Sequence, residues 1–138
     1  MNIYLHLKVA GALLLALGLA HSLFGRFFQW EKELEQLSLL TRQIFLVHCF
    51  FISLSIVLMG ACSVFYTKAL LGSGTLSRVV LTGFVAFWLT RLAFQFFVYD
   101  SGIWQGRRFY TVMHVIFSML WIYLVLIYSA ALRVAWIG

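Results

Sequence analysis

The chain has no proline and little charge. Only four of its 138 residues are acidic, and charged residues of both signs make up 10% of the sequence, compared with about 25% in a typical soluble domain. Hydrophobic residues make up 64%, more than a chain of this size can bury in water. These proportions exclude a soluble globular domain, a disordered chain and a disulfide scaffold. The lack of proline favours helical, largely unkinked segments.

Acidic residues are absent from the long apolar stretches. All four lie in two short polar segments, at Glu31, Glu33, Glu35 and Asp100. A carboxylate inside a span is typical of proton-coupled transporters, so the sequence disfavours that class. The net charge of +6 does not indicate nucleic-acid binding, because the basic residues mostly flank apolar segments, where lipid headgroups lie. Zinc-protease, phosphate-loop and serine-hydrolase motifs are also missing.

Four apolar stretches are long enough to cross a bilayer as helices, since a span needs about 20 residues. We predict these spans at about 3–25, 42–66, 78–98 and 110–134. Their apolar runs are continuous and do not alternate, which argues against transmembrane strands. Short connectors make neighbouring helices antiparallel. The sequence therefore predicts an all-α integral membrane protein, an up-down-up-down bundle of four transmembrane helices that forms a single domain over residues 1–138.

The first connector ends in an amphipathic segment. Within residues 33–40, Leu34, Leu37 and Leu40 share one face of a helix. This pattern predicts either an amphipathic stub at the membrane interface before the second span, or a second helix that begins early.

Three histidines and an arginine lie at similar depths in the predicted spans. His21 is near the end of the first span, His48 about two turns into the second, and His114 about one turn into the fourth. Arg91 lies about two turns before the third span ends. Antiparallel order then places all four about 5–12 Å below the same membrane face. Because each helix supplies one residue, we predict a shared site near that face.

Periodicity predicts which helix faces point inward. In the first span, small residues recur every seven positions, at Gly11, Gly18 and Gly25. His21 lies beside this stripe, and small residues on one face mark helix packing because they let backbones approach. In the second span, polar and small residues recur at the same interval, at Thr41, His48, Ser55 and Cys62. We expect this polar stripe to face protein and not lipid.

The third and fourth spans carry polar residues one turn apart, Arg91 with Gln95 and Tyr110 with His114. A charge at the centre of a span costs at least about 2.5–3.5 kcal/mol, and no span contains an acidic residue to neutralise Arg91. The planar guanidinium suits a carboxylate or phosphate. We therefore expect Arg91 to hold an anionic group, such as a haem propionate, an acidic lipid or a carboxylate substrate. Gln95 and Tyr110 would orient a bound group or a ligand imidazole.

Imidazole is the commonest metal ligand in proteins. Together His21, His48 and His114 can bind zinc, copper or non-haem iron, and two of them can ligate haem. The leading hypothesis is therefore an intramembrane site for a metal or redox cofactor, used in electron or proton transfer or in a small oxidoreductase reaction. In layout, such a bundle resembles small cytochrome b-type anchor subunits, an analogy of architecture alone.

Two alternatives stay open at this point. The chain can be an accessory or assembly subunit of a larger membrane complex, with its histidines packed against a partner and no cofactor of its own. It can also be a lipid-binding or small-molecule-binding membrane protein, or a homo-oligomer with a transport role. All of these hypotheses place a multi-pass protein in the plasma or inner membrane. Lysine and arginine are shared almost evenly between the two membrane faces, so they do not set its orientation.

Overall fold

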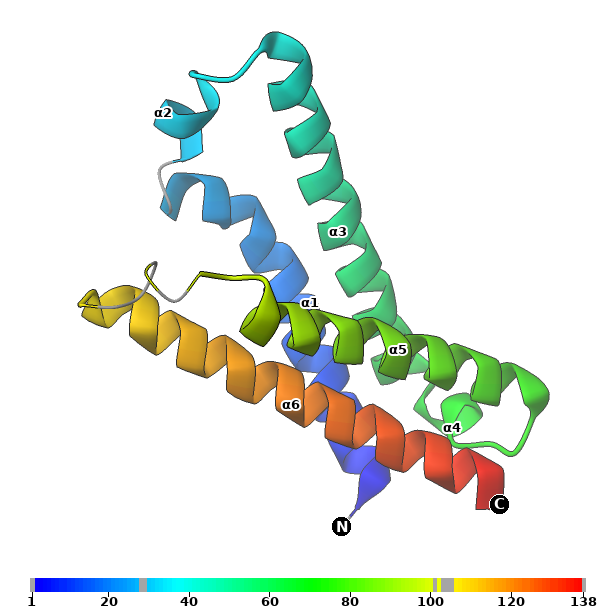
Figure 1. Ribbon diagram of the computed structural model, residues 1–138. Helices are drawn as coiled ribbons and strands as arrows, with labels where there is room; N and C mark the ends of the chain where they lie inside the picture. Colours follow the sequence, from blue (N-terminus) through cyan, green and yellow to red (C-terminus); the bar gives the residue numbers. More distant parts are fainter. Residues whose placement is uncertain (1, 28–29, 101, 103–105, 138) are drawn as a thin grey trace. The chain divides into compact units, whose positions relative to one another are not determined.

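The computed structural model describes residues 2–27, 30–100, 102 and 106–137, and all regular secondary structure in this part of the chain is helical (Figure 1). The helices are α1 (Ile3–Phe27), α2 (Trp30–Leu34), α3 (Leu39–Phe65), α4 (Thr67–Leu70), α5 (Thr75–Phe97) and α6 (Arg108–Ile137). Four of them, α1, α3, α5 and α6, are long and apolar enough to cross a membrane. This confirms the four predicted apolar helices.

The helix ends differ from the predicted spans by a few residues. Helix α3 begins at Leu39 because Ser38 caps it: the Ser38 hydroxyl accepts a hydrogen bond from the Thr41 amide at 3.3 Å. The second helix therefore begins early, as one alternative predicted. A short helix also precedes it, but this helix, α2, ends at Leu34. Leu37, expected on the face of the stub, is exposed and lies outside both helices.

The chain divides into two compact units. One unit is Lys8–Thr67, and the other combines Met1–Leu7 with Lys68–Gly138. Helix α1 contributes residues to both units. The single domain over residues 1–138 therefore stays a prediction.

In the unit Lys8–Thr67, helices α1 and α3 pack through small residues. A Cβ atom added to Gly11 would lie 2.8 Å from the Gly60 carbonyl oxygen and 2.9 Å from the Ser63 Cβ, so the two backbones are in close contact there. Two turns further along α1, the Gly18 carbonyl accepts a hydrogen bond from the hydroxyl of Ser53 on α3 at 2.7 Å. The glycine stripe is therefore confirmed as a packing face at Gly11 and Gly18.

The polar stripe of α3 is not the face that packs on α1 in the described part of the chain. The residues of α3 that meet α1 include Ser53, Val57, Gly60, Ser63 and Val64. His48 and Ser55 are exposed, and each hydrogen-bonds to the carbonyl one turn back in its own helix, at 2.8 Å in both cases. A polar side chain that hydrogen-bonds to a carbonyl of its own helix needs no hydrogen-bond partner on a neighbouring helix.

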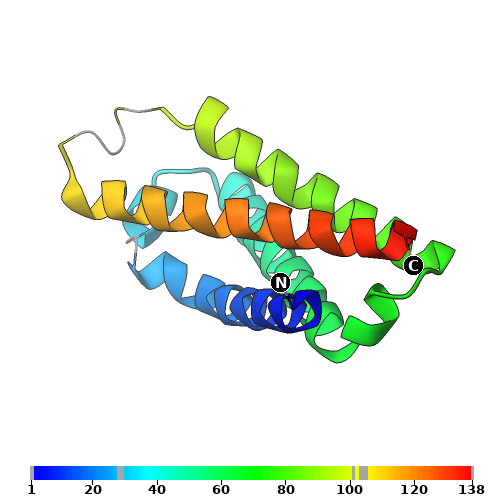
Figure 2. The same ribbon diagram turned by 90° about the horizontal axis from the view of Figure 1, so that it is seen from below.

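In the other unit, helices α5 and α6 run antiparallel and side by side (Figures 1 and 2). Aromatic contacts set their register. The Trp88 and Trp121 rings stack with their centroids 5.0 Å apart, and Phe84 meets Tyr128 edge to face at 5.1 Å. Trp88 and Tyr128 are buried almost completely. Stacked rings at matching positions on the two helices therefore hold one helix level with the other.

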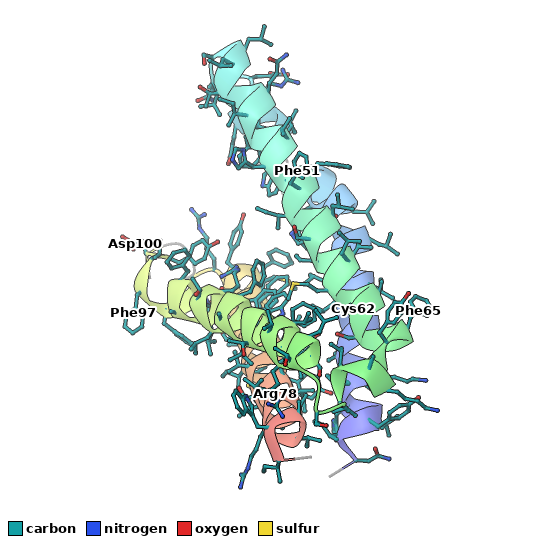
Figure 3. The ribbon with its side chains drawn as sticks, turned by 90° about the vertical axis from the view of Figure 1, so that its right-hand side faces the viewer. Phe51, Cys62, Phe65, Arg78, Phe97 and Asp100 are labelled. Carbon is teal, nitrogen blue, oxygen red and sulfur yellow. The ribbon has the colours of Figure 1, made fainter. Side chains whose placement is uncertain are left out.

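Polar contacts also join the helices of this unit. The Arg78 side chain, at the start of α5 (Figure 3), donates from Nε to the Ala135 carbonyl near the end of α6 at 3.0 Å, and its guanidinium lies over the Trp136 ring. His6, from the first turns of α1, lies 3.2 Å from the Tyr123 hydroxyl on α6 through its Nδ1. A side-chain hydrogen bond therefore links the start of α1 to α6 within this unit.

Candidate functional site

A polar cluster lies in the half of the α5–α6 pair near the connector between these helices. Arg91 and Gln95 are one turn apart on α5, and Gln95 meets His114 on α6. The Trp88–Trp121 stack fixes this pairing, because each of its members lies seven residues from Gln95 or His114 on the same helix. Seven residues are close to two full turns, so the polar pair and the aromatic pair share the same two faces.

Three of the predicted site residues form one chain of hydrogen bonds. Arg91 donates from Nη1 to the Gln95 Oε1 at 3.1 Å. The Gln95 amide nitrogen lies 2.7 Å from the His114 Nδ1. Gln95 is 5% exposed, and the other two side chains are half-buried. Hydrogen bonds in such a low-dielectric setting strengthen one another. This series of hydrogen bonds therefore links α5 to α6.

Aromatic rings flank the Arg91 guanidinium. Its Cζ lies 5.0 Å from the ring centre of Trp121 and 5.6 Å from that of Tyr99. Cation–π contacts of this kind contribute about 0.5–2 kcal/mol each, which offsets part of the cost of placing the charge there. In the described parts of the chain, no carboxylate pairs with Arg91, and Gln95 takes one of its five N–H donors.

The ring beneath Arg91 belongs to an aromatic stack. Trp121 lies almost parallel to Trp88 and, on α6 itself, to Phe117 at 5.6 Å. The indole nitrogens of Trp88 and Trp121 are enclosed and have no hydrogen-bond partner among the described residues.

Tyr110 lies outside this cluster. Its side chain is 38% exposed, and its described contacts are with the Phe109 ring at 5.5 Å and the Arg107 guanidinium at 5.8 Å. It is one turn before His114 on α6, yet the nitrogen that meets the His114 Nδ1 belongs to Gln95. Among the described residues, no contact between Tyr110 and His114 supports the orienting role predicted for Tyr110.

The other two predicted ligands, His21 and His48, lie in the unit Lys8–Thr67, whereas His114 lies in the second unit. Each of the two hydrogen-bonds through Nδ1 to its own helix, His21 to the Leu17 carbonyl at 3.0 Å and His48 to the Ile44 carbonyl at 2.8 Å. His48 is exposed and His21 half-buried. Neither histidine takes part in the described packing contacts between α1 and α3.

Among the residues that the structure describes, no three histidine, cysteine or acidic side chains lie close enough together to hold a metal ion. The described residues therefore give no support to the shared metal site of His21, His48 and His114, which stays a prediction. The structure instead brings His114 together with Arg91 and Gln95, the residues expected to bind an anionic group and to orient an imidazole.

The sequence alone did not assign Tyr99 or Trp121 to this site. Trp121 follows His114 by two turns on α6, so helical spacing already places it on the same face of the fourth span as His114, although spacing gives it no role there. Tyr99 lies beyond the last residue of α5, Phe97. Its contact with Arg91 depends on how the chain turns after the helix, which no periodicity reveals.

No family model, curated protein or solved structure matches this chain. The cluster of Arg91, Gln95 and His114 is therefore the starting point for assigning a function.

Proposed function

We propose that this chain is a multi-pass membrane protein whose α5–α6 cluster binds the anionic, hydrogen-bond-accepting group of a membrane-soluble ligand. In this proposal α1, α3, α5 and α6 cross the bilayer in up-down-up-down order. The proposal adopts the lipid-binding or small-molecule-binding alternative from the sequence, together with the anionic group expected at Arg91.

The observation that carries the proposal is a half-buried cation without an acidic partner among the described residues. Arg91 lies in an apolar helix, and no described carboxylate neutralises it. An unpaired charge in a span is expensive, and such residues mark binding sites and pathways. The Arg91 Cζ lies over the rings of Trp121 and Tyr99. A ligand would meet the N–H groups of the guanidinium, to which carboxylates and phosphates bind through two oxygens.

The depth of the cluster suits a ligand anchored at the membrane interface. Arg91 lies six residues before the last residue of α5, and His114 lies six residues after the first residue of α6, which is about 9 Å along either helix. Arg107 and Arg108 lie at this same end of the pair, whereas Arg78 lies at the opposite end (Figure 3). The positive charge of Arg107 and Arg108 would draw an anionic headgroup towards the cluster.

A carboxylate and a phosphate both meet these requirements. Either group presents several oxygens to the donors of Arg91, and the apolar part of the same molecule would remain in the hydrocarbon layer. An acidic phospholipid, a fatty acid and a haem propionate share this chemistry. Experiment must therefore separate a lipid headgroup from a free anion.

The test is thermal unfolding of the purified protein in neutral detergent. We expect phosphatidic acid or oleate to raise the melting temperature, and phosphatidylcholine to leave it unchanged. Arg91→Gln should weaken this binding at least tenfold, because a hydrogen bond to a charged group contributes about 1.5–3 kcal/mol and about 1.4 kcal/mol corresponds to a factor of ten.

Arg78→Gln is the matched control, since it removes another partly buried arginine from the same helix. Arg78 already has the Ala135 carbonyl as its partner, so this variant should lose stability yet keep the response to anions. Equal stabilisation by inorganic phosphate would identify a free anion as the ligand. Equal responses in native protein and Arg91→Gln, or no response to any anion, would contradict the proposal.

A metal or haem at His21 or His48 is the second candidate function. In both residues Nδ1 faces a backbone carbonyl, which only accepts, so Nδ1 carries the hydrogen and Nε2 keeps its lone pair. Metal-binding histidines have this arrangement. Elemental analysis of native protein and of His48→Ala tests this candidate. We expect about one transition metal ion per chain in native protein and none in the variant. Equal metal content in the two proteins would contradict a role for His48.

A further inference from the structure

We infer that Gln95 fixes the ring proton of His114 and thereby decides which kind of ligand the cluster accepts. This inference rests on the proposed function, because it names the residue that sets the specificity of the same site. The guanidinium of Arg91 has donors only. Arg91 must therefore donate, and the Gln95 side-chain oxygen must face it, as the 3.1 Å contact shows.

The orientation of the Gln95 amide then determines the state of His114. Its NH₂ group is left to face the His114 Nδ1 at 2.7 Å. Since this group only donates, Nδ1 must accept, and a neutral imidazole then carries its hydrogen on Nε2. The reversed amide would set two donors against each other at Arg91. All bonds therefore point in one direction, from Arg91 through Gln95 to His114.

His114 thus differs in kind from the two histidines of the other unit. His21 and His48 donate from Nδ1 to carbonyl oxygens of their own helices, which leaves the hydrogen off Nε2. The same side chain is therefore held in opposite tautomers in the two units. The cause is local: a carbonyl acceptor at His21 and His48, and an amide donor at His114.

This tautomer suits an oxygen ligand and opposes a metal. An Nε2–H group donates to a carboxylate or phosphate, as Arg91 does. A metal needs a lone pair at Nε2, and the histidines that bind metals have an acceptor, not a donor, at their other nitrogen. Gln95 therefore acts as a positioning residue that matches His114 to an anionic ligand.

Nitrogen NMR of the ¹⁵N-histidine-labelled protein tests this assignment, at about pH 8.5, well above the usual histidine pKa of about 6.5. In native protein we expect the proton of His114 on Nε2 and none on Nδ1. A proton on the His114 Nδ1 would overturn the inference, whether or not the protein binds anions.

Gln95→Glu should reverse the tautomer. A carboxylate at this position accepts from both sides, so Arg91 can still pair with it while the His114 Nδ1 becomes the donor. Gln43→Glu, the same change at an exposed position on α3, should leave His114 unchanged. Gln95→Leu, which can neither donate nor accept, should give a mixture of both tautomers. Unchanged His6 resonances would report that the fold of this unit is retained in each variant.

Added Ni²⁺ tests the consequence for ligand choice. We expect Ni²⁺ to broaden the His114 resonances in Gln95→Glu and to leave them sharp in native protein. Broadening of His114 in native protein, or an unchanged tautomer in Gln95→Glu, would refute the role of Gln95. If the tautomer follows Gln95 as expected but no anion stabilises the native protein, the proposed function fails while the tautomer assignment stands.

Discussion

Two serines on α3 show how a polar side chain in an apolar helix can take opposite roles. The Ser55 hydroxyl donates to the Phe51 carbonyl of its own helix, whereas the Ser53 hydroxyl donates to Gly18 on α1. His48 behaves as Ser55 does and bonds to its own helix. Polarity alone therefore does not identify a packing face, because the carbonyl one turn back can satisfy a hydroxyl or an imidazole.

This contrast yields a prediction for two matched variants. Ser53→Ala should lower the free energy of unfolding by about 0.6 kcal/mol, the average for hydrogen bonds between membrane helices, and by no more than about 1.7 kcal/mol, the largest value measured. Ser55→Ala should leave it nearly unchanged, because no bond between helices is lost. Unfolding in graded mixtures of mild detergent and sodium dodecyl sulfate measures both values. Equal destabilisation by the two variants would contradict the distinction between the serines.

At the scale of helices, α1 and α3 approach because their facing residues are small. Gly11 and Gly60 lie backbone to backbone, and Val57 fills the space beside Gly18. Lipid tails are as apolar as leucine, so packing of this kind, and not water exclusion, stabilises helix pairs in a membrane. At Gly25, the third glycine of the stripe, an added Cβ atom would meet only the Trp30 ring among the described atoms, at 3.8 Å.

Alanine at two of these glycines should therefore have different effects. A methyl group at Gly11 would lie 2.8 Å from the Gly60 carbonyl oxygen, and backbone cannot rotate aside as a side chain can. We expect Gly11→Ala to cost about 1–3 kcal/mol of stability, the usual penalty of overpacking. Gly25→Ala should be tolerated, since its new methyl group makes an ordinary contact. The same unfolding measurement checks both variants, and a tolerated Gly11→Ala would argue against close backbone contact.

At the scale of the whole molecule, apolar side chains cover much of the exposed surface. On α3 alone, Phe51 is 59% and Phe65 74% exposed, and both are marked in Figure 3. Patches of this extent are rare on soluble proteins and mark contact with lipid or with partners. The four long apolar helices and this surface together support insertion in a bilayer.

The proposed up-down-up-down order of four spans fixes where each connector must lie. Glu35, before α3, and Asp100, after α5, should share one side of the membrane, and Ser73, before α5, should lie on the other. Single cysteines at these positions, in a background of Cys49→Ala and Cys62→Ala, can be labelled with a membrane-impermeant maleimide in sealed vesicles. We expect Glu35→Cys and Asp100→Cys to react from the same side and Ser73→Cys from the opposite side. Any other pattern would contradict the up-down-up-down order.

The helices of this protein follow from its amino-acid sequence. Apolar runs without proline or acidic residues predicted four helices to within a few residues of their ends, because length and composition set what can cross a bilayer. The seven-residue spacing of Gly11 and Gly18 also predicted a packing face. The pairing of Arg91 with Gln95 follows from spacing as well, since residues four apart meet on any helix.

The partners of these side chains, in contrast, depend on how the helices pack. Periodicity placed His48 on an inward stripe, yet its own helix satisfies it, and Ser53, outside that stripe, bonds to α1. The bond between Gln95 and His114 depends on the register of α5 against α6, which the stacked tryptophans set. Helical spacing is a property of one chain segment, whereas register and rotation are properties of a pair, and the energy that fixes them comes from contacts between segments far apart in the sequence.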